Sequence, residues 1–154
     1  MSDWLLDSNI LLRGVDRTDP QFTLTLRAVG MLVGGGNALH FTMQGLTEFW
    51  NVCTRPATAR GGLGLPIAET ERRVRVIERV GVFLPDTAAV RAHWRRLVVI
   101  HQVQGVQVYD ARLVATMLAH NVTHLLTFNH ADFQRYPEIT AAHPQDLLDG
   151  RVQP

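Results

Sequence analysis

Acidic and amide side chains recur at four separated places in this sequence, each beside an apolar run that predicts a strand or a helix face. They are Asp7, Glu48, Asp110 and the pair Asn129 and Asp132. Carboxylates on an apolar background are costly to desolvate, and several that converge on one point repel each other. A bound cation is the usual remedy for such repulsion. The set therefore predicts one divalent-metal site, of the kind that hydrolyses phosphodiester bonds.

The donor types favour magnesium or manganese over zinc. Mg²⁺ takes oxygen ligands in an octahedron and keeps several waters, so it uses few carboxylates. Asp7, Glu48 and Asp110 supply enough for one ion, and Asp132 could add charge for a second. The sequence does not separate Mg²⁺ from Mn²⁺, because both accept oxygen ligands. The single cysteine, Cys53, cannot form a thiolate cluster, and the seven histidines show no His-Glu-x-x-His spacing.

The elements that must position these residues alternate along the chain. Apolar patterning predicts strands at 3–7, 38–42, 81–85, 124–127 and 139–142. It predicts helices from Ser8 or Asn9 onward and at 20–33, 43–55, 67–80, 87 to about 104, and 110–120. This alternation predicts an α/β fold with a mostly parallel sheet, whose ligands bind beyond the carboxyl ends of the strands. Asp7 and Asn129 follow predicted strands, and Glu48 and Asp110 lie near the starts of helices that could point at the same edge.

Each of these residues also has an ordinary structural explanation. Asp7 could cap a helix, and Asp110 could be a first-turn acid favoured by the helix dipole. Glu48 could pair with a nearby arginine. Asn129 and Asp132 could belong to turns. The ordered combination is more specific than any single residue, and this combination carries the metal-site prediction.

Length and composition predict one ordinary globular domain spanning residues 1–154. The apolar fraction is 46% and the formal net charge is +1, so any surface for nucleic acid must be local. All 15 basic residues are arginine, which excludes lysine-based catalysis. No apolar run approaches the roughly 20 residues that a membrane span needs. The N-terminus lacks the basic and apolar regions of a signal peptide, so a cytoplasmic location is expected.

The chain resembles the PIN-domain ribonucleases, and more narrowly the VapC-type toxins of toxin–antitoxin pairs. The matching segments are Leu6–Ile10, Glu48, Asp110–Ala115, Leu125–Asn129 and Asp132–Pro137. In order and spacing the likeness covers essentially the whole chain. It implies a PIN-like three-layer α/β/α sandwich with the activity of a metal-dependent endoribonuclease. It also implies a homodimer that is held inactive by a cognate antitoxin on a separate chain.

The resemblance assigns Mg²⁺ or Mn²⁺ binding to Asp7, Glu48 and Asp110. The family's fourth acidic position falls on Asn129, an amide, and Asp132 follows three residues later. The amide lowers the negative charge of the site by one, which weakens the expectation of a tightly held second metal. By the same resemblance Asp132 joins the catalytic set. Hydroxyls that orient a ligand or a water are then expected from Thr127 and Ser8.

Arginine and histidine residues near the predicted site are candidates for contact with RNA. Arg13 and Arg17 follow the first predicted helix and could bind phosphate, and His130 neighbours the acidic cleft. Arg112 lies about 200° around its helix from Asp110, so it need not face the same site.

Four other functions remain to be weighed. Receiver domains and haloacid-dehalogenase-type phosphatases also carry acidic pockets, but both need a lysine that this chain lacks. DNA as the substrate stays open. The serious alternative is a catalytically inactive PIN-fold module that binds RNA or a protein partner, and the amide at Asn129 keeps that alternative open.

Overall fold

Five short strands form one sheet in which every neighbouring pair is parallel. The computed structural model describes residues 1–154. In chain order the strands are β1 (Asp3–Leu6), β2 (Ala38–Thr42), β3 (Val82–Leu84), β4 (His124–Leu126) and β5 (Thr140–Ala142). Their spatial order is β3-β2-β1-β4-β5, so the chain builds outward from β1 on one side and then continues on the other. Such a reversal opens a crevice at the carboxyl ends of the central strands.

Helices connect the strands, and the predicted α/β class is confirmed. They are α1 (Ser8–Gly14), α2 (Phe22–Gly34), α3 (Met43–Thr54), α4 (Ile67–Val80), α5 (Ala88–Ile100), α6 (Val108–Ala119) and α7 (Pro144–Leu148), with short 3-10 turns η1 (Gly105–Gln107) and η2 (His130–Phe133). Every predicted strand and helix occurs, and the sheet is fully rather than mostly parallel. None of these helices has the length and apolar character needed to cross a membrane.

One helix end and one additional helix differ from the prediction. The helix expected to reach about Gln104 ends at Ile100, because Gln102 adopts the left-handed backbone (φ 50°) that ends the regular turn. The last helix, α7, was not predicted at all. It is short, starts with Pro144, and is capped by His143, whose Nδ1 accepts the Gln145 N–H at 3.0 Å.

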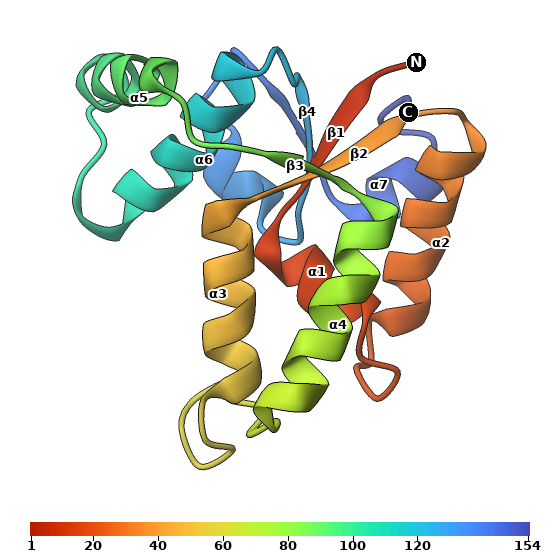
Figure 1. The fold of residues 1–154 in the computed structure, drawn as a ribbon. Coiled ribbons are helices and arrows are strands. Elements are labelled where there is room, and N and C mark those ends of the chain that lie inside the picture. Colours follow the sequence, from red (N-terminus) through yellow and green to blue (C-terminus); the bar gives the residue numbers. More distant parts are fainter.

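The sheet lies between two helical layers, and alternate residues of each strand face opposite ones. On β1, Trp4 and Leu6 point into a core with α1, α2, α3, α4 and α7. Leu5 points into a second core with α5 and α6. Leu126 and Leu125 repeat the division on β4. Figure 1 shows the same arrangement, with α5 and α6 together on one side of the sheet. The expected three layers are therefore present.

Side-chain caps bring two helices to the carboxyl edge of the sheet without intervening loops. Asp7 follows β1 directly and accepts the Ser8 N–H through Oδ1 at 2.7 Å, so α1 begins at once. Thr42 ends β2, and its Oγ1 accepts the Gly45 N–H at 3.0 Å at the start of α3. Both caps satisfy N–H groups that a helix start leaves unpaired. The caps thus fix where the first residues of α1 and α3 stand.

Candidate active site at the carboxyl edge of the sheet

Asp7 lies at the point where the strand order reverses. Its Oδ1 accepts the Ser8 N–H, and its Oδ2 accepts the Thr127 hydroxyl at 2.8 Å from the end of β4. Burial raises the pKa of Asp7, the bonds from Thr127 and Ser8 lower it, and the charge of Glu48 raises it again. The net shift is upward. Asp7 is therefore a helix cap, as its sequence position suggested. It is also a carboxylate whose ionised form is disfavoured by burial and by the charge of Glu48.

Glu48 is held at both of its carboxylate oxygens. Oε2 accepts the Ser8 hydroxyl at 2.8 Å, and Oε1 accepts the Gln44 side-chain N–H at 3.2 Å. Ser8 therefore touches two acids, Asp7 through its backbone and Glu48 through its hydroxyl. No arginine pairs with Glu48, so the ordinary explanation as an ion-pair partner does not hold.

Asp110 stands in the first turn of α6, half-buried, with no hydrogen bond to its carboxylate. Burial, followed by the charge of Asp7, raises the pKa of Asp110 to about 6. Asp132 and Glu48 act in the same direction, and Arg135 acts against them. The acids from four separate elements therefore share one electrostatic environment, as the sequence predicted when it placed them at one edge.

The buried Thr127 hydroxyl links the end of β4 to α1. It donates to Asp7 and accepts the Asn129 backbone N–H at 3.1 Å and the Asn9 side-chain N–H at 3.3 Å. This uses one donor and two lone pairs, the full capacity of a hydroxyl. Asn129 and Asp132 themselves are exposed, and the Asp132 N–H bonds to the Asn129 carbonyl at 3.0 Å in a short turn. Asn9 was not singled out in the sequence.

The donor set fits a hydrated oxygen-binding cation. Asp7, Glu48 and Asp110 form no ion pair with any arginine or histidine. No three His, Cys, Asp or Glu side chains in the chain stand close enough together to hold a metal ion by themselves. Mg²⁺ is commonly bound by one or two carboxylates while it keeps its waters, so a closed cage is not required. Uncompensated carboxylate oxygens of this kind suit Mg²⁺ or Mn²⁺.

Two of the three candidate RNA contacts lie beside this edge. The Arg13 guanidinium stacks over the Phe128 ring at 4.0 Å, directly after β4. His130 follows Asn129 but turns toward α7, where its Nε2 lies 4.0 Å from Asp146 and its ring lies 5.6 Å from that of His143.

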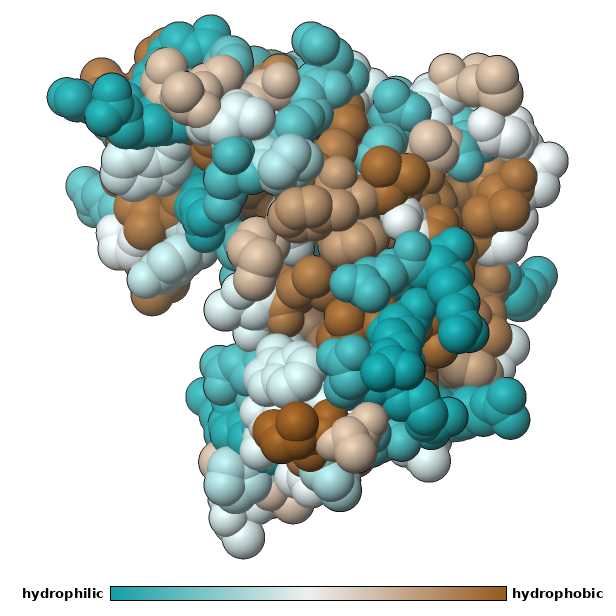
Figure 2. Space-filling model, in the orientation of Figure 1, coloured by the Kyte–Doolittle hydropathy of each residue, from teal (hydrophilic) through white to brown (hydrophobic).

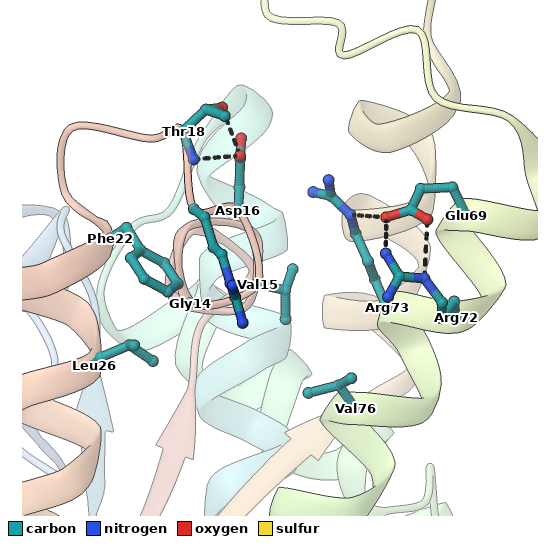
Figure 3. A pocket seen from close by; sticks show the side chains of 11 residues that line it. Gly14, Val15, Asp16, Thr18, Phe22, Leu26, Glu69, Arg72, Arg73 and Val76 are labelled. Atoms are coloured by element: carbon teal, nitrogen blue, oxygen red, sulfur yellow. Dashed lines mark hydrogen bonds and ion pairs between the residues drawn. The ribbon is translucent and has the colours of Figure 1, made fainter.

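Arg17 lies elsewhere, in a cavity of about 570 Å³ between the α1–α2 connection and α4. Figure 3 shows Glu69 bonded to Arg72 and Arg73 on one wall and Asp16 bonded to Thr18 on the other. None of the predicted acidic residues lines this cavity. The structure therefore does not bring Arg17 to the carboxylates.

Three residues of the site were missed or misplaced in the sequence. Gln44 lies one turn before Glu48 on α3, a spacing that could have indicated contact. Arg112, which from its helix spacing need not face the site, reaches across to Gln44 and to Asp86. Arg135 is the cation that acts on Asp110; it lies in the Asp132–Pro137 segment, but no role was assigned to it from the sequence.

The sequence and the fold are similar to those of known proteins. A family model described as the PIN domain matches residues 4–139. No curated protein matched the sequence significantly. The structure is similar to VapBC2 from Rickettsia felis, solved with a DNA fragment from their promoter, with a TM-score of 0.66 and 14% identity over 92% of this chain and 98% of that one.

Two further solved structures support the same fold. FitAcB from Neisseria gonorrhoeae has a TM-score of 0.67 and 17% identity over 94% of this chain and 99% of that one. VapC20 from Mycobacterium tuberculosis, a sarcin-ricin loop cleaving toxin, has a TM-score of 0.57 and 14% identity over 79% and 86% of the two chains. With the family model spanning most of its sequence, the chain belongs to the PIN-domain family.

Proposed function

We propose that this chain is a metal-dependent endoribonuclease and the toxin of a toxin–antitoxin pair. The observation that carries the proposal is that Asp7, Glu48 and Asp110 lie at the carboxyl edge of a PIN-domain sheet without an ion-pair partner. Burial, followed by the charges of the neighbouring acids, raises the pKa of Asp110. Structural sites compensate such charges with arginine, whereas catalytic metal sites leave them for an ion.

In this proposal Asp7, Glu48 and Asp110 hold Mg²⁺ or Mn²⁺, with Asp132 and the Asn129 amide at the rim. The chemistry supplied by such an ion, when bound, is activation of a water and stabilisation of charge on the attacking and leaving oxygens of a phosphodiester. Ser8 orients Glu48, and Thr127 orients Asp7.

The phosphate of the substrate and the acidic residues are both negatively charged, so they repel each other. Arg13, flat on Phe128, and Arg135, held by Gln107 at 2.8 Å, are the cations best placed to offset that charge. Guanidinium groups bind phosphate through paired N–H donors. We assign phosphate contact to these two arginines, and not to Arg17.

The partners follow from the relatives. Several similar structures are complexes of a toxin with its antitoxin, including one from Klebsiella pneumoniae with a TM-score of 0.55 and 17% identity over 91% of this chain and 96% of that one. We propose a cognate antitoxin on a separate chain, a homodimer as the working form, and action in the cytoplasm.

The deciding experiment is cleavage of total bacterial RNA by purified protein, with Mg²⁺, with Mn²⁺ and with chelator, beside Asp7→Asn. Discrete fragments that require metal and vanish in the variant are expected, and mapping of their ends names the target. A parallel single-stranded DNA substrate tests the other nucleic acid. Metal-independent cleavage, or an active Asp7→Asn protein, would contradict the assignment.

The second candidate is an inactive PIN-fold module that binds RNA or a protein. It is favoured by the amide at Asn129, where the family carries an acid, and by the lack of a complete protein cage for a metal. Retention of labelled RNA on the protein with no cleavage under any metal would select this function over the nuclease.

A further inference from the structure

The side chain of Gln44 bridges two helices that carry the proposed acidic residues. Its Nε2 donates to Glu48 Oε1 at 3.2 Å and to the Tyr109 carbonyl at 3.0 Å. An amide nitrogen carries two hydrogens, so both bonds form at once. Tyr109 directly precedes Asp110 at the start of α6. Gln44 therefore fixes the spacing between the Glu48 carboxylate on α3 and the first turn of α6.

Arg112 decides which way the Gln44 amide faces. Its Nη1 donates to Gln44 Oε1 at 3.4 Å, and its Nη2 donates to Asp86 Oδ2 at 2.9 Å. A flipped amide would place Oε1 against the Glu48 carboxylate and the NH₂ group against the guanidinium, so both contacts would become repulsive. Arg112 thus selects the orientation in which Gln44 is a donor to Glu48.

Asp86 binds the Arg112 guanidinium on the side away from Glu48 and so holds it in place. Arg112 and Asp86 form an ion pair, and both side chains are partly exposed. Without Asp86, the guanidinium would be free to swing toward Glu48. An arginine paired there would neutralise a proposed ligand and compete with a divalent cation for the same oxygens.

We propose that Asp86, Arg112 and Gln44 form a positioning relay that keeps Glu48 oriented beside Asp110 for the metal. The relay rests on the proposed nuclease function, because it acts on the ligands of that site. Its members touch neither substrate nor metal; they act through the Glu48 carboxylate. The Ser8 hydroxyl holds the other Glu48 oxygen at 2.8 Å, so the carboxylate is steadied from two sides.

The test measures Mn²⁺ binding by calorimetry together with RNA cleavage as a function of Mn²⁺ concentration. The variants are Gln44→Met, Arg112→Met and the double variant, because methionine keeps the length of the side chain and removes its hydrogen bonds. Two exposed matched controls are Gln153→Met and Arg75→Met, the second of which breaks the Arg75–Glu71 pair at 3.2 Å on α4. Thermal melts followed by circular dichroism report on the fold.

Gln44→Met is expected to raise the Mn²⁺ Kd by about tenfold or more, the range seen when a partner of a metal ligand is removed. Saturating Mn²⁺ restores most of the cleavage rate, and the melting temperature stays near that of the wild type. Arg112→Met acts in the same direction. The double variant is no weaker than Gln44→Met alone, because Arg112 acts through Gln44. Both controls bind like the wild type.

Should Gln44→Met unfold, Asp86→Asn gives the same test at an exposed position, with an expected rise in Kd of about threefold. Two results would overturn the relay and leave the nuclease assignment standing. One is wild-type Mn²⁺ affinity in the folded relay variants. The other is a double variant whose loss of Mn²⁺ binding free energy equals the sum of the losses in Gln44→Met and Arg112→Met. A wild type that neither binds Mn²⁺ nor cleaves RNA would overturn both together.

Discussion

At the scale of single residues, Asp110 is a half-buried carboxylate whose surroundings disfavour the ionised form. Burial and the charges of Asp7, Asp132 and Glu48 raise its pKa to about 6, and no hydrogen bond compensates. The ionised Asp110 carboxylate therefore lowers the stability of the folded protein, and we propose that the same charge is needed for cleavage. Removing the charge therefore has opposite effects on activity and on folding.

Asp110→Asn is expected to abolish cleavage and to stabilise the metal-free protein at neutral pH. Because the pKa of Asp110 is raised in the folded state, the folded state loses stability as the pH rises from the usual aspartate value to about 6. The loss is complete above about 6 and absent below the usual aspartate value. The half-exposed position screens the repulsion, so the gain is about 1 kcal/mol, or about 3 °C.

The measurement is thermal unfolding of both proteins in chelator at about pH 7.5 and about pH 4.5, between which the pKa of Asp110 falls. The variant should melt higher at both pH values, with a clearly larger advantage at the upper one, because at about pH 4.5 only part of the penalty from ionising Asp110 has developed. Equal melting temperatures at both values would contradict the account of Asp110, and unchanged cleavage would contradict its role.

Arg135 should affect RNA binding rather than the chemical step. Its guanidinium is exposed, tethered to Gln107 and close enough to act on Asp110. Arg135→Met is expected to raise KM about fivefold with kcat little changed, and to reduce the salt dependence of binding by about one phosphate contact. Filter binding across salt concentrations checks this, with Arg75→Met as the control. An unaltered salt slope would remove Arg135 from the RNA surface.

At the scale of elements, the strands, the helices and the residues at the strand ends could be predicted from the sequence. Asp7 and Asn129 follow apolar runs, and a parallel sheet gathers such positions at one edge. The link from Gln44 to Arg112 was out of reach, because it depends on how α6 is rotated against α3. Arg17 was misplaced for a related reason, since its position depends on the course of the α1–α2 connection.

Thr127 joins β4 to α1, and its removal should loosen that junction. The hydroxyl is fully buried and serves Asp7, Asn9 and the Asn129 backbone. Thr127→Val keeps the shape and leaves these partners unpaired, so stability should fall by about 1–3 kcal/mol. Mn²⁺ affinity should also fall, by about tenfold, because Asp7 loses its anchor.

Urea unfolding and calorimetry measure the two effects of Thr127→Val. Thr25→Val is the matched control, since the Thr25 hydroxyl is equally buried and bonds only to the Gln21 carbonyl within its own helix region. Thr127→Ser should keep both properties near wild type. If Thr127→Val matches Thr25→Val in stability and binds Mn²⁺ normally, the junction has no special role.

At the scale of the whole molecule, exposed apolar side chains gather in two places. Figure 2 shows one, an apolar surface over β3 and beside α4, bordered by a hydrophilic stripe along α4. Its members include Val76, Val80, Val82 and Phe83. The stripe carries Arg72, Arg75 and Arg79. Arg72 and Arg75 pair with Glu69 and Glu71, and burying these charged groups between two copies would cost desolvation, so this face is poorly suited to self-association.

The other apolar surface is better suited to the proposed homodimer. Residues 97–109, from the end of α5 to the start of α6, contain no Asp, Glu, Lys or Arg. Within them Val99, Ile100 and Val106 are 73%, 61% and 81% exposed. An uncharged apolar surface meets its own copy without repulsion and buries area that water otherwise covers. Since this segment leads directly into Tyr109 and Asp110, pairing there would also steady the start of α6.

The double variant Ile100→Asp with Val106→Asp is therefore expected to be monomeric, because each interface would bury four unpaired carboxylates. Light scattering at high micromolar concentration should show a dimer for the wild type and for Val82→Asp, which charges the other apolar surface instead. Cleavage per protomer should fall in the double variant if pairing steadies α6. A dimer that survives the double substitution, or a monomeric wild type, would place the interface elsewhere or remove it.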